Sequence, residues 1–124
     1  MKYDIGQALL KLKPGAQWVI RGDVYSGIEW LDSVQTKPTE TEINNKISEL
    51  DAAEPMRLLR VERNKRLADC DWVVTKAIET GDMVSNVWKA YRQSLRDLPL
   101  SSSPQLDSYY NLDLTSVNWP TEPS

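Results

Sequence analysis

Two arginines that lie one helical turn apart, Arg92 and Arg96, have the residue type and the spacing to recognise carboxylates. They flank the aromatic residues Trp88 and Tyr91 in the amphipathic segment 86–99. A guanidinium group can hydrogen-bond a carboxylate through two N–H groups while its stem packs on an aromatic ring. We expect either an internal clasp that joins two helices or a direct contact with a partner protein, and a structural role in both cases. The candidate carboxylates are Asp69, Asp71 and Asp97.

The single cysteine of the chain, Cys70, lies between Asp69 and Asp71. Carboxylates on both sides disfavour the thiolate that a nucleophile or a metal ligand requires. We therefore expect Cys70 to be an inert residue at the end of a helix. One cysteine also allows no disulfide within the chain, which favours a protein made and used inside a cell.

The rest of the composition argues against an enzymatic function. The chain has 124 residues and no histidine, so it lacks the usual acid–base side chain near neutral pH and the commonest neutral metal ligand. It contains neither a glycine-rich phosphate-binding motif nor the spacing of a metal site. We therefore predict that the protein is not an enzyme, holds no metal and needs no cofactor.

Charge and hydropathy narrow the class of partner. The net charge is −3 and the sequence pI is about 5.0, so no basic field attracts nucleic acid. The segment 57–66 is locally basic but carries no interleaved aromatic residues, which favours a solvated face with ion pairs over RNA binding. No apolar run is long enough to cross a bilayer, and the first residues lack a secretory signal. We expect no nucleic acid, membrane or small-molecule partner.

The N-terminal residues show local signals for a helix and a hairpin. Asp4 followed by Gln7 is a capping box, which predicts a helix over residues 4–12. The segment 17–32 contains two β-rich runs separated by glycine-containing turns, which predicts a hairpin. A two-stranded sheet is too small to be stable alone, so it should pack on the helix. The expected core contains Ile5 and Leu9 together with Trp18 or Trp30.

A second capping box, Thr39 with Glu42, predicts the start of another helix. Proline lacks the N–H group that a helix interior needs, so Pro55 should stop or kink this helix near Ala53. We expect a boundary there, with residues 1–54 as a small α+β unit.

The C-terminal half is expected to be helical up to Pro99. The helix should resume after Pro55, and Asp82 is the candidate N-cap of a last helix that Pro99 closes. The prediction is an α+β protein with parts 1–54, 55–99 and 100–124. The expected core of the middle part is Trp72, Trp88 and Leu95.

The segment "YYNLDLTSVNWP" follows a polar linker and alternates apolar with polar residues, which indicates an extended conformation. Such a segment can lie on the sheet edge or groove of a partner, or it can fold back over its own helices. Both alternatives remain open.

Three stretches of the C-terminal half closely resemble the phage tail assembly chaperone family. They are "RNKRLADCDW", then "VWKAYRQSLRDLP", then the closing "VNWP". The resemblance covers about residues 57–120, and the compound pattern W-x-x-Y-R-Q-x-L-R-D-x-P is rare. Where the family usually has a proline-containing loop after a "DWT" turn, this chain has no proline before Asp82, so its connection should differ or be partly helical. The N-terminal half is similar to small tail proteins of cyanophages and related marine phages.

The resemblance implies a phage protein that binds tail or tail-fibre proteins, or copies of itself, in the host cytoplasm during assembly. One alternative is a transient assembly chaperone. The other is an adaptor or fibre-associated protein that is retained in the virion. A small enzyme is a distant third. The candidate residues for partner binding or for a structural clasp are Trp72, Trp88, Tyr91, Arg92, Arg96, Tyr109, Tyr110 and Trp119.

Overall fold

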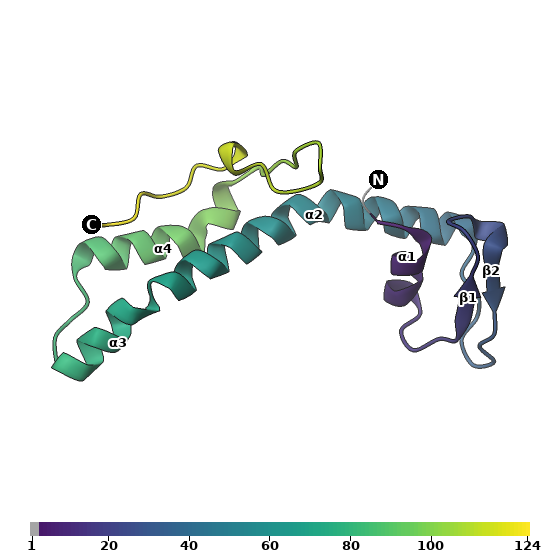
Figure 1. The fold of residues 1–124 in the computed structure, drawn as a ribbon, viewed down its shortest axis with the longest axis horizontal. Coiled ribbons are helices and arrows are strands. Elements are labelled where there is room, and N and C mark those ends of the chain that lie inside the picture. The colour runs from purple at the N-terminus through teal and green to yellow at the C-terminus, as the bar shows by residue number, and fades with distance from the viewer. Residues whose placement is uncertain (1–2) are drawn as a thin grey trace. The chain divides into compact units, whose positions relative to one another are not determined.

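The computed structural model describes residues 3–124 and confirms the predicted α+β class (Figure 1). The chain divides into two compact units, Met1–Glu54 and Pro55–Ser124. The elements in chain order are α1 (Ile5–Leu12), β1 (Trp18–Ile20), η1 (Tyr25–Gly27), β2 (Ile28–Trp30), α2 (Glu40–Asp69), α3 (Asp71–Thr80), α4 (Asn86–Ser101) and η2 (Leu114–Ser116).

Helix α1 begins with the capping box predicted from the sequence. The Asp4 carboxylate accepts a hydrogen bond from the Gln7 amide at 2.8 Å, and the Gln7 side chain accepts one from the Asp4 amide at 3.0 Å. Two amides that the helix leaves free are thereby satisfied. The buried face of α1, which includes Ile5 and Leu9, packs against Ile28 of the hairpin and against the start of α2.

Strands β1 and β2 form the predicted antiparallel hairpin, with Trp18 opposite Trp30. Both tryptophans pack against the cluster that contains Ile5 and Leu9, which confirms the expected core. At Gly27 the backbone passes so close to Arg21 that an added Cβ would lie 2.0 Å from the Arg21 carbonyl oxygen. Only glycine fits at this position.

Helix α2 starts after the predicted capping box, in which the Thr39 hydroxyl accepts a hydrogen bond from the Glu42 amide at 3.1 Å. Of the two alternatives, a stop near Ala53 is wrong, because α2 continues through Pro55 to Asp69, whereas a kink stays a prediction. Proline removes one backbone hydrogen bond, but packing on both sides of it keeps the neighbouring turns helical. Ile47 is buried in the first unit and Leu59 in the second.

Two helix boundaries of the second unit differ from the prediction. Asp82 is not an N-cap: Gly81 ends α3 in the left-handed conformation (φ 74°), and α4 begins only after Ser85. Asp82 accepts a hydrogen bond from the Thr80 hydroxyl at 3.1 Å instead. Pro99 does not end α4, which reaches Ser101, since the loss of a single amide donor is tolerated in a last turn.

The predicted core of the second unit is correct for Leu95 and wrong for Trp72. Leu95 is completely buried and Trp88 partly, but the Trp72 side chain is 53 % exposed. The reason is the phase of α3. Its buried positions are Val73 and Ala77, four residues apart, and a residue directly before Val73 is rotated about 100° away from that face.

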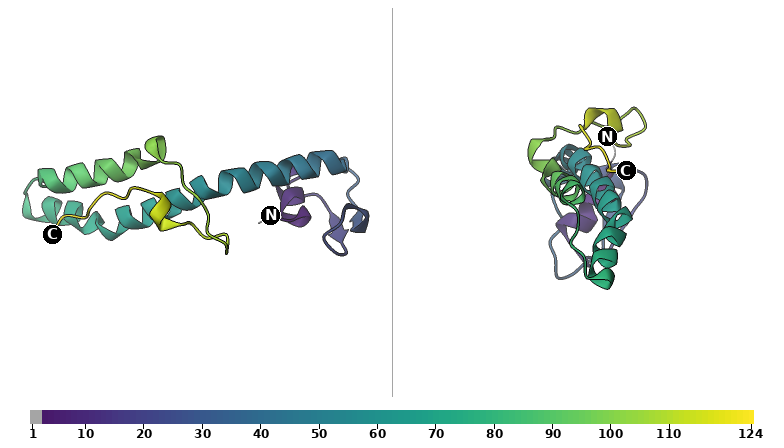
Figure 2. Two further views of the ribbon diagram at one scale, coloured as in Figure 1. Left: turned by 90° about the horizontal axis from the view of Figure 1, so that it is seen from above. Right: turned by 90° about the vertical axis from the view of Figure 1, so that its left-hand side faces the viewer.

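The C-terminal segment folds back over α2 and α4, as the ribbon views show (Figures 1 and 2). Val117 is buried against Leu59 of α2 and Leu98 of α4. Of the two arrangements left open by the sequence, the chain on its own adopts the folded-back one.

Candidate functional site

Three aromatic side chains of the second unit lie in a row that leads from the surface to the core. The Trp72 and Trp88 rings meet edge-to-face with centroids 5.7 Å apart, and Trp88 meets Tyr91 in the same way at 5.9 Å. Tyr91 is buried, and this burial, followed by the nearby Glu122 carboxylate, raises the pKa of its phenol. These edge-to-face contacts restrict the orientation of the exposed Trp72 ring.

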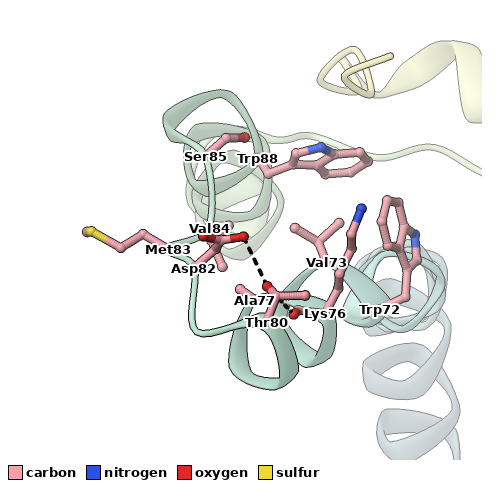
Figure 3. Close-up of a pocket in the computed structure, with 10 residues that line it drawn as sticks. All are labelled: Trp72, Val73, Lys76, Ala77, Thr80, Asp82, Met83, Val84, Ser85 and Trp88. Carbon is pink, nitrogen blue, oxygen red and sulfur yellow. Dashed lines mark hydrogen bonds between the residues drawn. The ribbon is translucent and has the colours of Figure 1, made fainter.

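A cavity of ≈ 250 Å³ opens beside this row, between α3 and α4 (Figure 3). Trp72 and Trp88 line it together with the apolar side chains of Val73 and Ala77. Met83, in the connection between the helices, is 83 % exposed, and its side chain points away from the cavity (Figure 3). The site therefore combines an apolar recess with the exposed ring of Trp72 at its edge.

Charged groups stand at the same opening. Lys76 and Asp82 both contribute to the cavity lining. A mixed-charge edge around an apolar recess is typical of a protein-binding surface, where the recess supplies binding free energy and the edge supplies orientation. Between residues 3 and 124, no group of three or more His, Cys, Asp or Glu side chains is placed to hold a metal ion.

Arg92 holds α4 against the junction of α2 and α3. Its guanidinium donates to the Asp71 carboxylate at 2.9 Å, to the Leu67 carbonyl at 3.1 Å and to the Cys70 sulfur at 3.0 Å. Partial burial of Arg92 disfavours its charge, but the hydrogen bonds to Asp71 and Cys70 outweigh this effect and raise its pKa. The expected contact between Arg92 and a carboxylate is confirmed for Asp71.

Cys70 is completely buried at the position that precedes α3. Its thiol donates to the Leu67 carbonyl at 3.4 Å and accepts from Arg92. This placement at a helix end is the one expected from the sequence.

Arg96 does not take part in this clasp. Its guanidinium donates to the Gln93 side chain at 2.8 Å, and Gln93 in turn donates to Asp97 at 2.9 Å. The expectation that Arg96 binds a carboxylate is wrong, because one helical turn carries it past the α2–α3 junction to an exposed position. The Arg96 backbone carbonyl accepts a hydrogen bond from Arg63 at 3.1 Å.

The tyrosines of the C-terminal segment lie in a separate tight turn. The Asp107 carboxylate accepts hydrogen bonds from the Tyr109 and Asn111 amides at 2.8 and 3.0 Å. Tyr109 and Tyr110 are exposed there, and Tyr110 has a positive φ of 62°. The structure does not bring these two residues to the aromatic row.

Trp119 returns to the helices. Its ring centroid lies 4.1 Å from the Arg66 guanidinium carbon, and the ring packs against the buried cluster of Tyr91 and Leu95. Of the candidate residues, the structure therefore gathers Trp72, Trp88, Tyr91, Arg92 and Trp119 around the same helices.

The cavity residues of α3 and of the following connection were missed by the sequence reasoning. The expectation was a connection before Asp82 that differs from the family's loop or is partly helical. Val73, Ala77 and Thr80 follow the spacing of one helical face, and Gly81 is a typical residue after a helix end. These signals could have revealed both α3 and the side of it that faces α4.

Residues 56–124 match the model of a protein family described as phage tail assembly chaperone protein. The match covers more than half of the chain and includes all of α3, α4 and the C-terminal segment. Among curated proteins and solved structures, none matches the chain significantly. The comparisons lend no support to a resemblance between the N-terminal half and small tail proteins of cyanophages. Within the described residues, no helix is both long and apolar enough to span a membrane.

Proposed function

The chain belongs to the phage tail assembly chaperone family and hence has a role in tail assembly, and from this premise we propose that it binds a tail or tail-fibre subunit through the cavity between α3 and α4. The subunit places an apolar side chain in this cavity, against the Trp72 and Trp88 rings, and is released as it joins the tail. This work is done in the host cytoplasm during assembly.

The exposure of Trp72 is the observation that carries this proposal. A tryptophan that is 53 % exposed, beside an apolar recess, is costly to leave in water unless a partner covers it. Tryptophans at the centre of an interface often contribute most of the binding free energy. Here Trp88 and Tyr91 support the ring, and Arg92 holds the helices that carry it.

The cavity is suited to binding rather than to catalysis. Lys76 and Asp82 are its charged lining residues. The Thr80 hydroxyl lies beside Asp82, but the sequence has no histidine that could activate it as a general base. Family membership favours protein partners, so we assign the site to protein–protein contact.

The test is capture of tail proteins from phage-infected cells by the tagged full chain. Trp72→Ala should reduce capture of a tail protein by about tenfold or more, the effect of losing one central aromatic contact. Leu100→Ala is the matched control, since Leu100 is 89 % exposed at the end of α4 and does not line the cavity. Captured proteins are identified by matching their masses to proteins of purified virions.

Equal capture by the Trp72→Ala and Leu100→Ala variants, both folded by circular dichroism, would rule out the cavity as the docking site. The same mass spectra separate a transient chaperone from a retained adaptor. A chaperone is absent from purified virions, whereas an adaptor is present in stoichiometric amounts.

A further inference from the structure

The C-terminal segment of the chain (residues 112–124) occupies an apolar seam between α2 and α4. The seam is formed by Leu59 and Leu67 of α2 and by Leu95 and Leu98 of α4.

Three apolar side chains of the segment, those of Leu112, Val117 and Trp119, pack in this seam. Val117 is 6 % exposed and lies in the cluster of Leu59 and Leu98. Trp119 touches this cluster and also the cluster of Leu95, with the Arg66 guanidinium over its ring at 4.1 Å. The seam therefore recognises a β-branched residue two positions before a tryptophan.

The hydrogen bonds of the segment's end do not reach the helices. In the described chain, residues 117–124 form hydrogen bonds only with residues 114–117 and with one another. One example is the Trp119 indole, which donates to the Leu114 carbonyl at 3.1 Å. This end is thus held on the helices by side-chain packing and by the cation–π contact, without backbone pairing.

The preceding residues form a loop that closes on itself. The Gln105 amide donates to the Ser116 hydroxyl at 3.0 Å, and the Asp113 amide donates to the Gln105 carbonyl at 2.9 Å. Residues 105–116 can therefore keep these bonds while the whole segment leaves the seam. The connection to α4 is a short stretch without regular structure, residues 102–105.

We propose that the α2–α4 seam is a docking site for the C-terminal segment of a second copy of this chain, so that two copies exchange these segments. The position of the segment in its own chain shows which peptide fits the seam. The segment of another copy has the same side chains and can make the same contacts. Exchange of an identical element loses no native contact and requires only that the connection opens.

Two oppositely charged side chains provide a way to observe the exchange. Glu122 of the segment and Lys65 of α2 line the same small cavity. A zero-length carbodiimide reagent joins a lysine amine to a carboxylate as an amide with loss of water. The Lys65–Glu122 product therefore reports which copy supplies the segment.

The direct test mixes unlabelled and ¹⁵N-labelled wild-type chains, cross-links them after equilibration and analyses the Lys65–Glu122 peptides by mass spectrometry. Exchange gives peptides with one labelled and one unlabelled half, and their share rises with protein concentration. Products that are always of a single isotope, at every concentration, overturn the proposal. This test uses no substitution and does not depend on the binding of a tail protein at α3 and α4.

A second measurement tests the seam alone. A fluorescent peptide with the sequence of residues 112–124 is titrated into full-length Trp119→Ala protein, whose own segment competes weakly. We expect it to bind this variant at least about tenfold more tightly than wild type, and a peptide with alanine at the tryptophan position to lose binding. No binding to folded Trp119→Ala protein contradicts the docking site. Peptide binding accompanied only by single-isotope cross-links contradicts the exchange.

Discussion

Single carboxylates hold several turns of this protein by accepting backbone hydrogen bonds, and Asp32 is the strongest case. Its side chain accepts hydrogen bonds from the amides of Gln35 at 2.6 Å, Val34 at 3.0 Å and Gln17 at 3.1 Å. The bond from Gln35, followed by that from Gln17, lowers the pKa of Asp32 below the ordinary 3.8. The residue thus ties the start of the hairpin to the chain that leaves it.

This shift predicts a specific dependence of stability on pH. A carboxyl group with a lowered folded-state pKa binds fewer protons in the folded than in the unfolded state, so it stabilises the fold above pH 3.8. That contribution is lost as the pH falls through the lower folded-state value. Asp32→Asn should therefore be less stable than wild type at neutral pH, and the difference should shrink below pH 3.8.

Urea denaturation midpoints at a series of pH values measure this difference. Glu79→Gln changes an exposed carboxylate on α3 and serves as the control, expected to follow wild type throughout. A gap between Asp32→Asn and wild type that stays constant down to the lowest pH would refute the role of the Asp32 charge.

At the scale of elements, the second unit depends on how α4 is fastened to the α2–α3 junction. Arg92 reaches a carbonyl, a sulfur and a carboxylate that all belong to this junction. The Asp71 side chain is 62 % exposed, so its ion pair with Arg92 contributes little by itself. The larger effect is expected from the bonds of the largely buried Arg92 side chain to the Cys70 sulfur and to the Leu67 carbonyl, which also accepts from the Cys70 amide at 3.2 Å.

We predict that Arg92→Lys destabilises the second unit by about 1–2 kcal/mol, because an ammonium group cannot reproduce the fixed fork of a guanidinium. Arg96→Lys, one turn further along α4, should change stability by less than about 0.5 kcal/mol, as is usual for an exposed residue. Thermal unfolding followed by circular dichroism gives both values. Equal losses of stability for the two substitutions would show that the contacts of Arg92 stabilise the unit no more than those of the exposed Arg96.

At the scale of the whole molecule, two units share one continuous helix. Each unit has its own buried cluster, and α2 passes from one to the other at Pro55. Proline has no N–H group to donate within a helix, which weakens the helix at this point. Local opening of α2 should therefore concentrate near this point.

Limited trypsin digestion tests this prediction. The first cuts should follow Arg57 or Arg60, directly after Pro55, and come before a cut after Arg21 in the hairpin. Pro55→Ala restores the missing amide and should slow the cuts in α2 several-fold by stabilising the helix. An initial cut at Arg21, or an unchanged rate for Pro55→Ala, would contradict independent behaviour of residues 1–54.

The sequence by itself determined the features that depend on a few neighbouring residues. The capping boxes at Asp4 and Thr39, the hairpin and the contact of Arg92 with a nearby acidic residue were all predictable. The physical reason is that a capping box needs only residues three apart, and a hairpin only two runs and a turn. The family was likewise recognisable from the spacing of conspicuous residues in the C-terminal half.

Tertiary structure decided what depends on which distant surfaces meet. The exposure of Trp72 follows from the face that α3 presents to its neighbours, and a tryptophan's type alone does not reveal this face. Packing in both units carries α2 through Pro55, against the local preference of proline to end a helix. The contact of Trp119 with Arg66 also depends on tertiary structure. Residues far apart in the chain meet only when the free energy gained by burying apolar surface outweighs the entropy lost on ordering the segment between them.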